Sequence, residues 1–80
     1  MTLTEHELTN ITVELLTRVV GCPVDVSSSR ENTTEWDSLN HLKLLLELNE
    51  RFKIRIPFED YGKLNSVQDI VRFLHRIVKF

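Results

Sequence analysis

Ser38 stands between Asp37 and Leu39 at the start of a leucine-rich segment. Asp37 can accept hydrogen bonds from the free backbone N–H groups of the next turn, which makes it a suitable N-cap for a helix that begins at Ser38. The free N–H groups and the helix dipole would stabilise a negative charge there, for example a phosphodiester on the serine hydroxyl. Serine and aspartate also gather at helix starts for purely local reasons. The position alone therefore leaves a modification site and a capping role open.

Asp37, Ser38 and His41 also permit a hydrolase interpretation, because residues three apart on a helix share a face and His41 could approach the Ser38 hydroxyl. A catalytic triad additionally needs an oxyanion hole, a cleft and a base placed between nucleophile and acid. Three near-adjacent residues in a chain of 80 do not supply these, and the sequence has no GxSxG motif. We therefore expect no enzyme. The histidines are scattered and Cys22 is the only cysteine, so we expect no metal site.

The elements that would hold Ser38 are helical. Thr4 and Glu7 have capping-box spacing, and the apolar residues that follow predict a helix over residues 5–20 that ends at Gly21. Residues 22–36 have no sustained period and predict a long loop. Three apolar residues should anchor this loop, namely Val24, Val26 and Trp36.

The second helix is predicted to begin at Ser38 and reach Phe52, with a broad apolar arc and one narrow exposed strip. The apolar arc contains Leu39, Leu42, Leu45, Leu46, Leu48 and Phe52, and the strip contains Asn40, Lys43, Glu47 and Glu50. Residues 53–56 are too few for more than an extended connector. Pro57 suits the first turn of a short third helix that uses Phe58, Tyr61 and Leu64.

A fourth helix should open at Ser66, with Asp69 completing the cap and apolar residues repeating as far as Val78. Leu46 and Leu74 are expected inside the protein, on two helices that face each other. The sequence thus predicts an all-α fold: a four-helix bundle of three main helices and one short third helix, with a long loop between helices one and two. Residues 1–80 should form one domain.

Several of these segments together resemble the acyl and peptidyl carrier protein family. They are Trp36-Asp37-Ser38-Leu39, the hydrophobic helix after it, the RFKIRIP segment that ends at Pro57, and the entry to the last helix over residues 64–70. The resemblance implies that Ser38 is esterified to 4′-phosphopantetheine, whose thiol carries an acyl or aminoacyl group as a thioester. It also implies that Asp37 assists a phosphopantetheinyl transferase, which installs the arm from coenzyme A with magnesium.

The further partners implied by the resemblance are a loading enzyme and a downstream transferase or synthase of a biosynthetic pathway. They would recognise the surface beside Ser38, for which the candidate residues are Leu39, Asn40, Lys43 and Glu47. Carriers of fatty-acid synthases have a glycine and a small residue before Asp-Ser-Leu and a markedly acidic second helix. Glu35, Trp36 and the mixed charges of this chain are more similar to discrete carriers of specialised pathways.

Composition favours a soluble protein, with 41% hydrophobic and 28% charged residues. No signal peptide or membrane-spanning segment is apparent, so we expect a cytoplasmic protein. Because Met1 leads almost directly into the first cap and the chain ends within the last amphipathic helix, we expect a free-standing carrier, although excision from a larger synthase stays open. We also expect a monomer. The main alternative is a small helical module that binds nucleic acid or protein without the modification. A basic stripe on the last helix favours it, consisting of Arg72, His75, Arg76 and Lys79. The formal charge of −2 and the pI of about 5.9 argue against nucleic acid.

Overall fold

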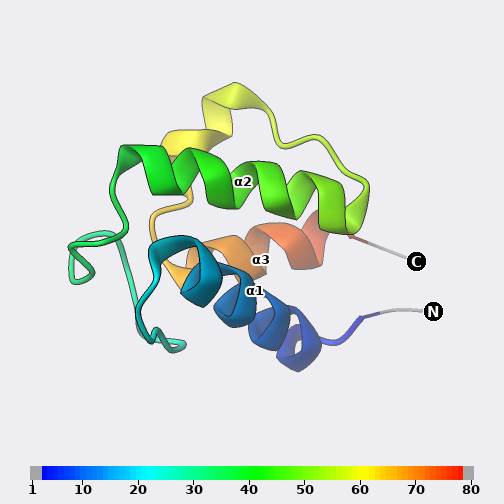
Figure 1. Cartoon of the computed structure of the whole chain (residues 1–80). Coiled ribbons are helices and arrows are strands. Elements are labelled where there is room, and N and C mark those ends of the chain that lie inside the picture. The colour runs from blue at the N-terminus through cyan, green and yellow to red at the C-terminus, as the bar shows by residue number, and fades with distance from the viewer. Residues whose placement is uncertain (1–2, 79–80) are drawn as a thin grey trace.

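Three α-helices and one short 3-10 helix make up the regular structure of the computed structural model, which describes residues 3–78. The elements are α1 (Glu5–Val20), α2 (Ser38–Phe52), η1 (Phe58–Lys63) and α3 (Val67–Ile77). Helix α1 packs against both α2 and α3, and Figure 1 shows α2 crossing above the other two. Within residues 3–78 there is no β-strand, so the all-α prediction is confirmed.

The helix ends lie where the sequence signals place them. Thr4 and Glu7 form both bonds of the capping box at the start of α1, and Gly21 ends that helix with a left-handed φ of 78°. Ser66 caps α3 by accepting a hydrogen bond from the backbone N–H of Asp69. These interactions satisfy backbone groups that a helix end leaves free, which is why short local patterns fix the boundaries.

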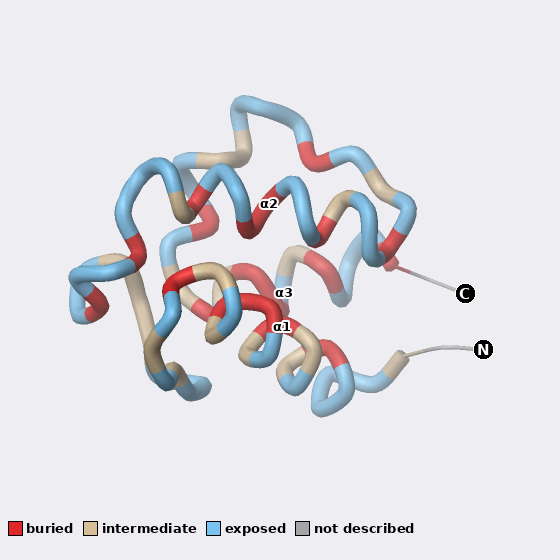
Figure 2. The backbone as a smooth tube through the Cα atoms, viewed as in Figure 1, coloured by how far each residue is buried: buried red, intermediate tan, exposed pale blue. Residues whose placement is uncertain are grey.

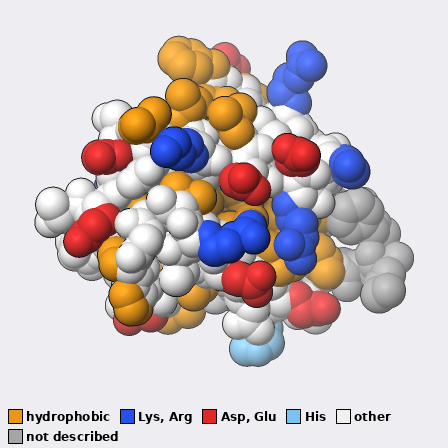
Figure 3. Space-filling view, viewed as in Figure 1, with side chains coloured by type: hydrophobic (Ala, Val, Ile, Leu, Met, Phe, Trp, Pro, Cys, Tyr) orange, Lys and Arg blue, Asp and Glu red, His pale blue; other side chains and the backbone are white. Residues whose placement is uncertain are grey.

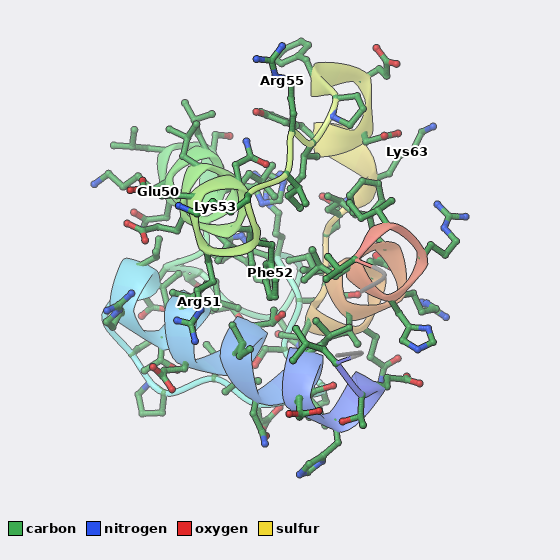
Figure 4. The ribbon with its side chains drawn as sticks, turned by 90° about the vertical axis from the view of Figure 1, so that its right-hand side faces the viewer. Glu50, Arg51, Phe52, Lys53, Arg55 and Lys63 are labelled. Carbon is green, nitrogen blue, oxygen red and sulfur yellow. The ribbon has the colours of Figure 1, made fainter. Side chains whose placement is uncertain are left out.

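The hydrophobic core lies between the three α-helices. Figure 2 shows the buried positions on the inward-facing sides of α1, α2 and α3. In Figure 4 Phe52 points from the end of α2 into the space between these helices, while Glu50 and Lys53 lie on the outer side. The fully buried side chains include Leu8, Leu15, Leu16, Trp36, Leu44, Leu45, Leu48, Ile70 and Leu74.

The predicted rotation of α2 was partly wrong. Leu39, Leu42 and Leu46 are exposed to 61%, 43% and 53%, whereas Leu44, absent from the predicted apolar arc, is fully buried. Because α1 and α3 both lie on the same side of α2, only one stripe of this helix is covered. Its buried residues are His41, Leu44, Leu45, Leu48 and Phe52. The exposed face is therefore broad and partly apolar. On α3, Leu74 is fully buried as predicted.

The short third helix exists, but it packs less than predicted. It is a 3-10 helix that Pro57 precedes, and the Phe58 side chain is 82% exposed. The Phe58 ring instead lies against the Tyr61 ring, with 5.2 Å between centroids. Leu64 is buried as expected. Residues three apart share one face of a 3-10 helix, which brings the Phe58 and Tyr61 rings together.

The loop between α1 and α2 is tied to the start of α3. The backbone N–H of Arg30 donates to the Asn65 carbonyl at 2.8 Å, and that of Val67 donates to the Ser28 carbonyl at 3.0 Å. These bonds flank an isolated antiparallel bridge between Ser29 and Ser66. Trp36 anchors the loop as predicted, but Val26 is 52% exposed and does not.

Candidate functional site

Asp37, and not Ser38, caps helix α2. The Oδ1 atom of Asp37 accepts a hydrogen bond from the backbone N–H of Asn40 at 2.9 Å. The side-chain amide of Asn40 donates in turn to the Glu35 carbonyl at 2.8 Å. Ser38 is the first residue of the helix and is exposed. Since capping is done by its neighbour, the Ser38 hydroxyl is left available at the positive end of the helix dipole.

The other four serines have local structural roles. The hydroxyls of Ser28, Ser29 and Ser66 accept hydrogen bonds from the backbone N–H groups of Asp25, Asn32 and Asp69. The Ser27 hydroxyl donates to the Asp25 carboxylate at 2.7 Å. Ser38 is therefore distinguished among the serines by a hydroxyl that no turn or cap uses.

Arg30 is the residue whose side chain approaches the Ser38 hydroxyl. An Nη group of Arg30 donates to Ser38 Oγ at 3.4 Å, and Arg30 Nε donates to the Trp36 carbonyl at the same distance. No sequence pattern marks Arg30, because it lies eight residues before Ser38 in a segment without periodicity. A cation beside a hydroxyl at a helix N-terminus adds to the positive potential there.

His41 is a packing residue, and its hydrogen bonds go to Trp36 and Tyr61 and not to Ser38. Its Nδ1 accepts a hydrogen bond from Trp36 Nε1 at 3.0 Å, and its Nε2 donates to the Tyr61 carbonyl at 2.8 Å. The side chain is only 5% exposed, and this burial lowers the pKa of His41. With both ring nitrogens engaged, His41 cannot act as a base for Ser38, so the hydrolase interpretation is wrong.

The predicted recognition residues lie along α2 in different settings. Leu39 and Lys43 are exposed, while Asn40 is half-buried and holds the loop through its bond to Glu35. Glu47 is exposed and lies 4.0 Å from Arg18 of α1. Leu42 and Leu46 extend the exposed apolar side of the helix. Figure 3 shows hydrophobic side chains gathered along the upper part of this face, above a charged region.

The basic stripe of the last helix carries less unpaired positive charge than its sequence suggests. Arg72 is paired with Asp69 at 3.0 Å, His75 and Arg76 are exposed, and Lys79 lies outside the described residues. The stripe borders a pocket of about 480 Å³, whose lining also includes the carboxylates of Glu5 and Asp60. This mixed lining does not form the continuous basic surface that nucleic acid requires.

Residues 3–78 also show what they offer for metal binding and for crossing a membrane. No group of three or more His, Cys, Asp or Glu side chains in this part of the chain could hold a metal ion. None of the described helices is long and apolar enough to cross a membrane.

The residues around Ser38 fit a covalently attached phosphodiester. Such a group needs a reachable hydroxyl, and it is stabilised by backbone N–H groups and nearby cations. Ser38 supplies the exposed hydroxyl, α2 supplies the helix N-terminus, and Arg30 supplies the cation. No carboxylate lies in the first turn of α2, although the Asp37 cap precedes it.

Comparison with known proteins agrees with this geometry. A model of the family described as "Phosphopantetheine attachment site" matches residues 11–74. The acyl carrier protein of Kineococcus radiotolerans is 29% identical over 73 residues, which cover 88% of this chain and 90% of that protein.

Two further relatives match over a shorter range. The acyl carrier protein of Campylobacter concisus is 37% identical over 43 residues, covering 54% of this chain and 56% of that protein. The acyl carrier protein of Thermosynechococcus vestitus is 40% identical over 42 residues, covering 52% of each. The chain spans about half the length of these two curated relatives. Since the family match covers most of the chain, the protein belongs to the phosphopantetheine attachment family, is a non-catalytic carrier and takes a covalent 4′-phosphopantetheine group.

Proposed function

We propose that residues 1–80 form one carrier domain in which Ser38 bears the arm. The observation that carries this proposal is the exposed Ser38 hydroxyl at the start of α2, which neither caps the helix nor stabilises a turn because Asp37 performs the capping. When bound, 4′-phosphopantetheine supplies a terminal thiol that holds an acyl or aminoacyl group as a thioester. The protein's own part is to present this arm at one end of the bundle and to offer α2 to partner enzymes.

Asp37 is proposed to assist the modification. Its carboxylate is exposed and adjoins Ser38, so it can help to hold the magnesium ion that a phosphopantetheinyl transferase brings with coenzyme A. Magnesium would then belong to the encounter with the transferase and not to a permanent site. We propose that the protein does this work as a monomer in the cytoplasm, where coenzyme A is available.

A loading enzyme and a downstream transferase or synthase are the other proposed partners. The mixed charges on α2, with Lys43 exposed beside the leucines, support a specialised biosynthetic pathway over housekeeping fatty-acid synthesis. The proposed contact residues are Leu39, Asn40, Lys43 and Glu47. Leu42 and Leu46 join them because the structure leaves both side chains exposed.

The attachment residue can be tested by mass spectrometry. The apo protein is incubated with coenzyme A, magnesium and a phosphopantetheinyl transferase, and its intact mass and peptide masses are measured. We expect one arm per chain, on the peptide that contains Ser38. Ser38→Ala should fold, as judged by circular dichroism, and remain unmodified, while Ser28→Ala should be modified like the parent. An arm on Ser38→Ala, or on a peptide from residues 27–29, would overturn the assignment.

A further inference from the structure

We propose that Arg30 binds the phosphate of the arm on Ser38 and thereby sets the direction in which the arm leaves the protein. This inference rests on the proposed attachment at Ser38. It makes Arg30 a positioning residue, since the side chain would contact the phosphodiester and not the distant thiol or its cargo.

The structure holds Arg30 in place from two sides. Its backbone N–H donates to the Asn65 carbonyl at 2.8 Å, which ties this part of the loop to the start of α3. Its Nε donates to the carbonyl of Trp36, a residue that is only 1% exposed. The side chain is thus fixed next to Ser38, and a fixed cation loses less conformational entropy when it binds an anion.

The guanidinium group has no carboxylate partner in the described part of the chain. Arg18, Lys63 and Arg72 form ion pairs there with Glu47, Asp60 and Asp69, but Arg30 forms none. Its acceptors are two neutral oxygens, the Trp36 carbonyl and the Ser38 hydroxyl. A half-buried arginine directed at a hydroxyl that carries no charge is poised for an anionic acceptor.

Esterification of Ser38 would supply that acceptor. The Oγ atom, now 3.4 Å from Arg30, would become an ester oxygen of a phosphodiester, whose charged oxygens are bonded to the phosphorus, two bonds from Oγ. The planar guanidinium fork matches phosphate oxygens better than a lysine ammonium does. Because Arg30 approaches from the loop, its contact would favour one orientation of the phosphate over the others that the helix N-terminus allows.

The inference is tested on matched apo and holo forms of the parent, Arg30→Gln, Arg30→Lys and Arg18→Gln. Intact and peptide masses first establish that each holo form carries its arm on Ser38. The ³¹P chemical shift of the arm is then measured, together with the melting temperature of every apo and holo form at low and high salt. Arg18 pairs with Glu47 on α2, so its variant controls for the loss of a cation elsewhere.

We expect attachment of the arm to raise the melting temperature of the parent more than that of Arg30→Gln, by roughly 1–5 °C at low salt. High salt should shrink this difference, because exposed charges are screened. The ³¹P shift should move in Arg30→Gln, move less in Arg30→Lys and stay unchanged in Arg18→Gln. A purely structural role would lower the melting of apo and holo forms equally and leave the ³¹P shift unaltered.

Two outcomes would count against the inference in distinguishable ways. An arm found on a residue other than Ser38 would overturn both the proposed attachment and the role of Arg30. An arm on Ser38, with the same ³¹P shift and the same apo-to-holo change in parent and Arg30→Gln, would overturn the role of Arg30 alone.

Discussion

His41 shows how a single buried side chain joins three parts of the molecule. It lies at the start of α2, accepts a hydrogen bond from Trp36 of the loop and donates one to the Tyr61 carbonyl of η1. Both bonds require the neutral imidazole with its proton on Nε2. Protonation of Nδ1 would place two donors against each other in a buried site, which agrees with the lowered pKa of His41.

This arrangement predicts a pH dependence of stability. As the pH falls below about 6.5, the unfolded chain takes up a proton on His41 before the folded protein does, so the free energy of unfolding should decrease. The decrease should stop once the pH is below the folded pKa as well. Urea titrations between pH 7.5 and 5 would measure this slope in the parent and in His41→Gln. The exposed His75 provides the matched control, His75→Gln.

His41→Gln should flatten the slope of the free energy of unfolding against pH, while His75→Gln should leave that slope unchanged. Equal slopes in all three proteins over this range would show that other groups dominate the acid response. The carboxylates of Glu7 and Asp25, whose pKa values are lowered by hydrogen bonds from Thr4 and Ser27, contribute at lower pH and are present in all three.

At the scale of the helices, two C-terminal caps share one backbone conformation but not one residue type. Gly21 ends α1 at φ 78°, and Lys53 ends α2 at φ 57°. A side chain at Gly21 would meet no atom within 4 Å, so Gly21→Ala should cost only the backbone penalty, about 1 kcal/mol. Lys53→Gly should instead raise the free energy of unfolding, by up to about 1 kcal/mol, because glycine adopts the left-handed conformation without strain. Part of this gain is offset because glycine makes the unfolded chain more flexible.

Chemical denaturation of both variants would show whether the free energy of unfolding falls in Gly21→Ala and rises in Lys53→Gly. An unchanged free energy of unfolding in Gly21→Ala would mean that α1 can end in another backbone conformation. A loss of stability in Lys53→Gly would mean that the lysine side chain contributes more than its backbone strain costs.

The rotation of α2 gives a second prediction at this scale. Leu74→Ala removes a fully buried side chain from α3 and should lower the free energy of unfolding by about 2–5 kcal/mol. Leu46 is 53% exposed, so Leu46→Ala should change it by less than about 0.5 kcal/mol. Thermal or urea unfolding would measure both changes. Equal losses in the two variants would restore the interior position that the sequence pattern predicted for Leu46.

These cases separate what the sequence could predict from what it could not. Helix ends were predictable because caps such as Thr4 with Glu7, and Gly21, are local chemistry. The face of α2 was not, because leucines at so many of its positions fit several rotations of the helical wheel. Ser38 was proposed as the attachment residue from a contiguous motif. The position of Arg30 beside Ser38 could not be predicted, because a backbone hydrogen bond to Asn65, far along the chain, helps to place it there, and such a bond leaves no pattern in side-chain types.

At the scale of the whole molecule, charge is divided between the two halves of the sequence. Residues 1–50 carry nine acids and three Lys or Arg, whereas residues 51–80 carry three acids and seven. Arg55 and Lys63 lie on the outside of the later half, near η1 (Figure 4). With the arm on Ser38, as proposed, a partner that acts on it would instead approach the start of α2, where Lys43 stands within the more acidic half of the sequence. Lys43 therefore differs in sign from most charged residues of the first half of the sequence.

Lys43 should accordingly contribute to the choice of partner, and reversing its charge should impair that choice. We expect the cognate loading enzyme to present acidic residues to Lys43. Lys43→Glu should therefore slow acyl or aminoacyl transfer from that enzyme, because these acidic residues would repel the new glutamate. The effect should fade with salt, since the Debye length is about 8 Å at physiological ionic strength. Lys53→Glu, at the far end of α2, is the matched control and should transfer normally. The melting temperature of Lys43→Glu should hardly move because the side chain is exposed, whereas Lys53→Glu places a carboxylate at the negative end of the α2 dipole and should melt slightly lower. Parent-like transfer by Lys43→Glu at low salt would place docking elsewhere, and the exposed leucines Leu39, Leu42 and Leu46 would be the next surface to alter.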